Sequence, residues 1–292
     1  MRILLDSFVS FFRNNYMQLA AALAYYGMFA LLPFLLLTAL LLGKSITSSQ
    51  EALEGLHRLT YQMVPEFQAV IFNELISLSR LSDTWGWVGI VSCLSCIFPL
   101  VVTIRNVFLT VFSAQRKRPV MIEILRDFST TIFLIVLLIF LVISQIIYDE
   151  LIIRFFMAIS FPLYIVDFMV NLTISTVGMT VFYYAFIPVK VGLKHICVGA
   201  VLTSVLWAVI NPTLVFLLKL NPKFGIAFGS LKTVFLIFMW VYFSFCVIVF
   251  GAEFIAQWDR RKEWGILSTK HGKNGVKETS PPLERDPPSL TP

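Results

Sequence analysis

Six long apolar runs constrain this chain more than any other feature of its sequence. A helix rises about 1.5 Å per residue, so about 20 apolar residues span the ~30 Å hydrocarbon core of a bilayer. Lipid offers no hydrogen-bond partners, and a helix satisfies its own backbone. We therefore predict six transmembrane helices. The runs are Leu19–Leu42, Trp85–Phe112, Phe128–Tyr148, Phe161–Ile187, Ile196–Leu218 and Thr233–Ala256.

Composition supports the same fold class. The 292 residues are 58% hydrophobic and 14% charged, whereas soluble domains carry about 25% charged residues. A water-soluble core cannot absorb so many apolar side chains. The sequence therefore predicts an all-α polytopic membrane protein whose six-span domain covers residues 19–258.

The distribution of basic residues predicts an orientation in the membrane. Loops two and four and the segment after the last run are basic, and the segment 43–84 is rich in acidic residues. By the positive-inside rule the basic segments face the cytoplasm, and so do both termini. The loop before the last run is an exception, because it contains three lysines although it is predicted on the outer side. Anionic lipid headgroups are the partners expected at the basic loops, and nucleic acid is not expected as a partner. The basic residues on the predicted cytoplasmic side are Arg116, Lys117, Arg118, Lys190, Lys194, Arg260, Arg261 and Lys262, and the lysines of the exceptional loop are Lys219, Lys223 and Lys232.

Three segments outside the runs have patterns of their own. Residues 1–18 alternate apolar and polar residues at helical period, which predicts an amphipathic helix in the membrane interface. Residues 43–84 follow a similar period and predict outer amphipathic helices divided at Pro65. Residues 259–292 are polar and rich in Pro, Gly and Lys, so we expect a disordered cytoplasmic tail.

Cysteine and histidine do not form a metal-binding pattern. Cys93 and Cys96 have the C-x-x-C spacing, but they lie inside the second apolar run, where small packing residues are the simpler interpretation. The three histidines, His57, His195 and His271, are scattered over different segments. We therefore expect no metal site and no cofactor.

Several ionisable groups interrupt the spans near the predicted cytoplasmic side. A charge inside the membrane costs several kcal/mol unless it is paired or hydrated. Arg105, Asn106, Asp127 and Glu253 fall at similar depth and are candidates for one inner polar cluster. In the alternative interpretation Arg105 extends to lipid headgroups and Glu253 only marks the end of its helix.

A polar stripe follows the outer half of span four. Asp167, Asn171 and Ser175 recur at intervals of four residues, so they share one helix face. Such a stripe can line a water-filled part of a substrate path, or it can form hydrogen bonds between helices. Both interpretations stay open at the level of sequence.

Small residues predict where helices pack closely. Ala200, Ser204 and Ala208 are spaced by four on span five, and Gly225 and Gly229 precede span six. Small residues let helix backbones approach one another in the membrane, and Gly251 in span six belongs to the same class.

The chain contains a set of short motifs: Ala20 to Tyr26 with Pro33, Lys117-Arg118-Pro119, Tyr184 to Pro188, Phe228-Gly229, Trp240-Val241-Tyr242 and Gly251-Ala252-Glu253. Together these motifs resemble the YihY/BrkB family of bacterial inner-membrane proteins. The resemblance covers about residues 10–258 and is most specific at the Trp-x-Tyr and Gly-Ala-Glu motifs of span six. It implies six spans, an inner-membrane location and an unsettled biochemical role, since members were once labelled ribonuclease BN and some were called virulence factors.

Three classes of function are weighed on these residues. A nuclease needs clustered carboxylates or an acid–base pair, but Asp167 and Glu253 are predicted near opposite membrane faces and no histidine joins either, so we expect no enzyme. The leading hypothesis is a transporter-like protein that handles a lipid or another amphipathic envelope component. The alternative is a non-transporting structural or accessory protein of envelope assembly. A homo-oligomer stays open.

Overall fold

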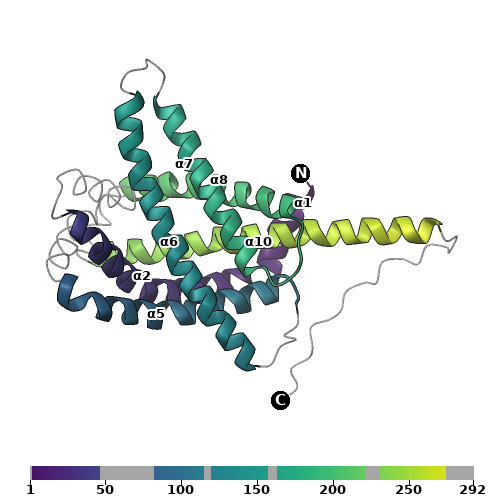
Figure 1. Ribbon diagram of the computed structural model, residues 1–292. Coiled ribbons are helices and arrows are strands. Elements are labelled where there is room, and N and C mark those ends of the chain that lie inside the picture. Colours follow the sequence, from purple (N-terminus) through teal and green to yellow (C-terminus); the bar gives the residue numbers. More distant parts are fainter. Residues whose placement is uncertain (1, 47–81, 115–119, 157–162, 221–230, 274–292) are drawn as a thin grey trace.

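The computed structural model describes residues 2–46, 82–114, 120–156, 163–220 and 231–273, and within them the regular secondary structure is entirely α-helical (Figure 1). This agrees with the predicted fold class. The helices are α1 (Arg2–Arg13), α2 (Tyr16–Ile46), α5 (Ser82–Val111), α6 (Val120–Phe156), α7 (Leu163–Phe186), α8 (Leu193–Leu220) and α10 (Leu231–Lys273).

Five of the described helices, α5, α6, α7, α8 and α10, are long and apolar enough to cross a membrane. Each contains most or all of one predicted run. The first predicted run, Leu19–Leu42, lies inside α2, which has 31 residues and is about 46 Å long. The described apolar part of α2, Tyr16–Leu31, is shorter than a span, so the count of six remains a prediction.

One helix continues into a segment for which the sequence predicted disorder. α10 continues to Lys273, whereas a disordered tail was expected from residue 259. The residues just after 259 explain this, because Arg, Lys and Glu are good helix formers and the first proline of the tail comes only at Pro281. Figure 1 shows this part of α10 projecting past the neighbouring helices. Residues 274–292 lie outside the described part of the chain.

The predicted outer segment 43–84 is described only at its two ends, where α2 reaches Ile46 and α5 begins at Ser82. Its predicted amphipathic helices, Pro65 included, fall in the part that the structure does not describe.

A sharp corner separates α1 from α2. Asn15 has φ 54°, the left-handed region, which Asn tolerates better than most residues because its short polar side chain bonds locally. The Asn15 carbonyl accepts from the Gln18 amide at 3.0 Å, which starts the new helix. The corner turns α1 away from the axis of α2 and lays it against α10.

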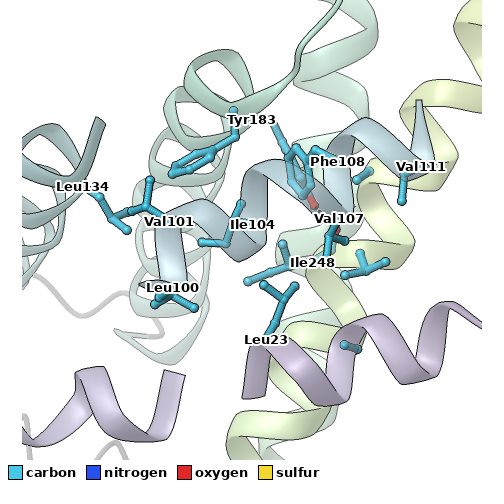
Figure 2. Close-up of a cluster of buried hydrophobic side chains, with 14 of the residues drawn as sticks. Leu23, Leu100, Val101, Ile104, Val107, Phe108, Val111, Leu134, Tyr183 and Ile248 are labelled. Atoms are coloured by element: carbon cyan, nitrogen blue, oxygen red, sulfur yellow. Dashed lines mark hydrogen bonds between the residues drawn. The ribbon is translucent and has the colours of Figure 1, made fainter. Parts of the chain in front are cut away.

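The main core lies where α5 meets α2, α10 and α7. Buried residues of α5 recur every three or four positions, as in Ile97, Val101, Ile104 and Phe108 (Figure 2). The Phe108 ring stacks on Tyr183 of α7, with centroids 6.1 Å apart and an interplanar angle of 28°. Lipid tails are as apolar as these side chains, so close packing rather than water exclusion holds the helices together.

A polar contact joins α7, α8 and α10 inside this core. The buried Tyr183 hydroxyl donates to the Ile248 carbonyl at 2.8 Å and lies 2.8 Å from Thr203 Oγ1. Gly251 faces this pair, and a Cβ built there would collide with both hydroxyl oxygens. The absence of a side chain at Gly251 therefore permits the three helices to meet.

We predict that Gly251→Ala destabilises the protein by about 1–3 kcal/mol, because a well-packed site must shift to admit the methyl group. The control is Gly192→Ala, whose Cβ would meet only the His195 ring at an ordinary 3.5 Å. Unfolding of both variants is followed in one detergent. A Gly251→Ala protein as stable as the control would contradict this packing account.

Candidate functional site

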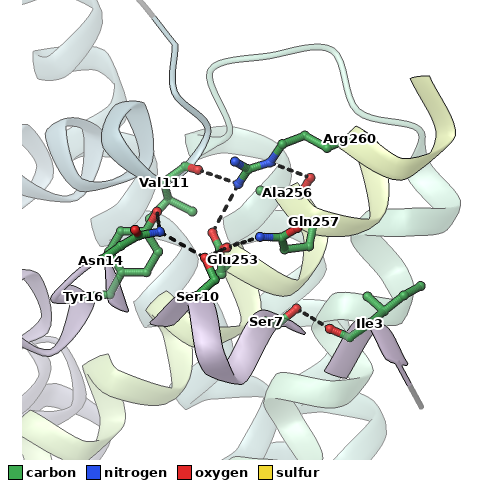
Figure 3. Close-up of polar contacts among 10 residues, drawn as sticks. All are labelled: Ile3, Ser7, Ser10, Asn14, Tyr16, Val111, Glu253, Ala256, Gln257 and Arg260. Atoms are coloured by element: carbon green, nitrogen blue, oxygen red, sulfur yellow. Dashed lines mark hydrogen bonds and ion pairs between the residues drawn. The ribbon is translucent and has the colours of Figure 1, made fainter. Parts of the chain in front are cut away.

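Helix ends converge around one segment of α10, between Glu253 and Arg260 (Figure 3). Ser10 of α1 bonds to Glu253, and the last residue of α5, Val111, accepts from Arg260. His195, at the start of α8, lies 3.6 Å from Asp259, measured from Nδ1 to Oδ1. The C-terminal ends of α1 and α5 and the start of α8 therefore share one end of the bundle.

Glu253 is completely buried, and its carboxylate is surrounded by donors. Ser10 Oγ donates to Oε1 at 2.6 Å, and Gln257 Nε2 donates to the same oxygen at 2.8 Å. Arg260 Nη2 lies 3.3 Å from Oε2 and supplies the balancing charge. A buried charge is tolerated only when it is paired and hydrogen-bonded, and Glu253 is both.

The partners of Glu253 extend the network to neighbouring elements. Asn14 Nδ2 donates to Ser10 Oγ at 3.0 Å and lies 3.4 Å from the Tyr16 hydroxyl. Arg260 Nη2 also donates to the Val111 carbonyl at 3.1 Å. That carbonyl is one of the last four of α5, which have no partner within the helix. The network therefore ties α1, α5 and α10 together.

A second buried cluster joins α5 to α6. Arg105 Nη1 lies 3.0 Å from Glu123 Oε2, and Nη2 lies 2.9 Å from Asp127 Oδ2. Glu123 and Asp127 are four residues apart, so both carboxylates leave α6 on the face toward α5. Two acids against one arginine give this triad a formal charge of −1. Arg105 Nε has no hydrogen-bond partner among the described residues.

The predicted inner cluster is thus divided into two groups. The structure brings Arg105 and Asp127 together, and it gives Glu253 a different arginine, Arg260. The Arg105 side chain is 8% exposed and paired inside the protein, so it does not reach out to headgroups. Asn106 is half-buried and lines an open pocket of about 410 Å³ at the end of α5. The other lining residues are Leu109, Thr110, Ser113 and Ala114.

The polar stripe of span four is described in part. All three of its residues lie on α7, with Asn171 half-buried and Ser175 exposed, and the side chain of Asp167 is outside the described part. Neither Asn171 nor Ser175 lines the pocket at the end of α5 or the apolar pocket described below. A substrate path along this stripe stays a prediction.

The predicted packing residues lie as follows. Ala200 and Gly251 are buried, as is Ser204, whose hydroxyl has no hydrogen-bond partner among the described residues, and Ala208 is half-buried. Gly225 and Gly229 are not among the described residues.

An apolar pocket of about 280 Å³ lies between α2, α5 and α6. Its volume is near the lower end of ligand pockets. Ile90, Ile132 and Val136 in its wall are also exposed, so the pocket borders the surface that a membrane would cover. Leu37, Leu94, Ile135 and Ile139 complete the lining.

Sequence reasoning missed several partners in both clusters: Ser10, Asn14, Glu123, Gln257 and Arg260. Local spacing was an available signal, since Ser10–Asn14, Glu123–Asp127 and Glu253–Gln257 are all i, i+4 pairs. No comparable local signal connects Ser10 with Glu253, which are 243 positions apart.

Long apolar helices joined by buried polar clusters define an integral membrane protein of the polytopic α-helical class. The comparisons give the family: residues 7–274 match the family Virulence factor BrkB, and the chain belongs to it.

Relatives are called UPF0761 membrane proteins. One from Chromohalobacter salexigens is 24% identical over 270 residues, which cover 90% of this chain and 65% of the relative. One from Alteromonas mediterranea is 23% identical over 80% of each chain. One from Photobacterium profundum is 29% identical over 86 residues, which are 29% of this chain and 27% of the relative. The matched part of this chain thus covers well under the full length of the relatives from Chromohalobacter salexigens and Photobacterium profundum. No solved structure was found to match it.

We predict that Arg105→Met destabilises the protein by about 3–5 kcal/mol, because it leaves two buried carboxylates without their partner. Arg126→Met, which removes an exposed arginine from the same region of α6, is the control and should change stability little. Unfolding free energy in detergent is the measurement. Adding Glu123→Gln and Asp127→Asn to Arg105→Met should restore part of the loss, and a triple variant no better than the single one would contradict the charge explanation.

Proposed function

We propose that this protein handles a lipid or another amphipathic envelope component in a transporter-like role. The observation that carries the proposal is the apolar pocket between α2, α5 and α6. Its lining is aliphatic, and its exposed edge faces the region that acyl chains fill in a bilayer. An acyl chain is the ligand whose chemistry fits such walls.

The position of the charged triad supports an amphipathic cargo. On α6, Asp127 precedes the pocket residue Ile132 by five positions, about 8 Å along the helix. A molecule with its chain in the pocket and its head toward the nearer helix ends would therefore have its head at about the depth of the charged triad. The apolar pocket and the charged triad thus lie at successive depths along the α5–α6 pair, in the same order as the tail and head of an amphipathic molecule.

We place the protein in a bacterial inner membrane with both termini in the cytoplasm. The convergence of helix ends supports this orientation, because it gathers basic residues at one end of the bundle. Anionic headgroups are the partners that these residues suit. The described basic residues there are Arg13, Arg126, Lys190, Lys194 and Arg260.

The second candidate is a structural or accessory role in envelope assembly. The specific observation in its favour is that both charged clusters are paired within the protein, as a static scaffold requires. The two candidates differ in whether a lipid moves.

We predict that the purified protein in vesicles accelerates leaflet exchange of a fluorescent phospholipid, measured by dithionite quenching with and without an imposed ion gradient. Ile132→Trp should obstruct the pocket and reduce the rate about tenfold, within the range by which apolar pockets discriminate. Phe133→Trp, at an exposed neighbour outside the pocket, is the matched control. Exchange no faster than in protein-free vesicles would reject lipid transport and favour the accessory role.

A further inference from the structure

Helix α1 has three distinct faces. At 100° per residue, its side chains fall into separate sectors around the helix axis. One sector is buried against the protein and holds Ser7, Ser10 and Phe11. A second holds the exposed charged residues Asp6 and Arg13. The third spans about 140° and consists of exposed apolar residues: Leu4, Leu5, Phe8, Val9 and Phe12.

The buried face is fixed by specific contacts. Ser10 bonds to Glu253, and Ser7 Oγ donates to the Ile3 carbonyl at 2.8 Å. The Phe11 ring meets Phe250 of α10 edge to face, with centroids 5.8 Å apart. The contacts of Ser10 and Phe11 with α10 set the rotation of α1 about its axis, so the outward direction of the apolar sector is set as well.

The contacts also set the depth of α1. Glu253 lies three residues before Ala256, the end of the last apolar run, which is about 5 Å along the helix. Amphipathic helices at a membrane surface bury their apolar face about 5–10 Å into the boundary between headgroups and acyl chains. The depth of α1 beside α10 agrees with that position.

We propose that Leu4, Leu5, Phe8, Val9 and Phe12 form a lipid-binding face that seats α1 in the acyl chains of the nearer leaflet. Phe8 and Phe12, with ring centroids 4.8 Å apart, present one aromatic surface to the lipid. The charged sector, turned away from the centre of this face, meets water and headgroups. The ionisable side chains of α1 are Arg2, Asp6 and Arg13, with a formal charge of only +1, so apolar contact by five side chains rather than attraction to anionic lipid seats the helix.

The face is independent of any cargo pocket. It needs only that the protein is integral to the membrane and that α1 keeps the contacts with α10 described above. Failure of the lipid-exchange experiment therefore leaves this proposal intact. Failure of the labelling experiment described next likewise leaves the proposal of lipid transport intact.

The test is spin labelling at single cysteines placed at positions 8, 10 and 13, after replacement of Cys93, Cys96, Cys197 and Cys246. The labelled protein is reconstituted in phosphatidylcholine vesicles, and relaxation by oxygen is compared with relaxation by a water-soluble nickel complex. We expect oxygen to dominate at position 8, nickel to dominate at position 13, and both to be weak at position 10. The same pattern is expected when phosphatidylglycerol is added.

Three spin-label results would overturn the proposal. Strong nickel relaxation at position 8 means that the apolar face lies in water, and weak relaxation by both reagents there means that a protein, such as a second copy of the chain, covers it. Dependence of the oxygen signal on phosphatidylglycerol would overturn the apolar seating. If the cysteine-free protein does not fold, a benzophenone amino acid at position 8 of the native sequence replaces the label. Lipid adducts found by mass at position 8 and not at position 10 then support the proposal, and their absence rejects it.

Discussion

The buried carboxylate of Glu253 is the constraint on which the arrangement of this protein's inner end depends. An ionised group near the end of an apolar run is unstable unless donors surround it. α10 itself supplies Gln257 and Arg260, and α1 supplies Ser10. Arg260 also donates to the Val111 carbonyl at the end of α5. The hydrogen bonds around the Glu253 carboxylate therefore position parts of α1, α5 and α10.

Polar contacts determine the arrangement of these helices because apolar packing alone is weakly directional in lipid. A leucine gains little by leaving acyl chains for a protein interior of the same polarity, so close approach and hydrogen bonds decide which helices pair. Gly251 provides the close approach, and the Tyr183 hydroxyl provides the hydrogen bond within the same helix layer. The triad of Arg105, Glu123 and Asp127 serves the α5–α6 pair in the same way.

The fold class was predictable from sequence, and the site was predictable in part. Five of the six predicted runs lie on helices long enough to cross a membrane, since the bilayer imposes one dimension on all of them, but α6 extends eight residues past its run at each end and α10 extends seventeen past its end. The pairing of Arg105 with Asp127 was predicted because both residues lie at a similar depth in the membrane. Depth alone does not determine which neighbour a charged residue pairs with, and Glu253 pairs with Arg260 instead. The periodicity of residues 1–18 predicted one amphipathic helix, and the structure has α1 over Arg2–Arg13 with Phe11 buried against the protein. The periodicity could not tell that Ser7 and Ser10 face the protein while Asp6 and Arg13 are exposed, because small hydroxyls suit either environment.

The most direct test of the central claim is a double-mutant cycle between Ser10→Ala and Glu253→Gln, with unfolding free energy measured in one detergent. Hydrogen bonds to charged groups are worth about 1.5–3 kcal/mol, so we expect a coupling energy of at least about 1 kcal/mol. Ser7→Ala combined with Glu253→Gln is the control and should be additive, because Ser7 bonds within α1. If Ser10 and Glu253 are also additive within about 0.5 kcal/mol, the carboxylate does not hold α1 and the account is wrong.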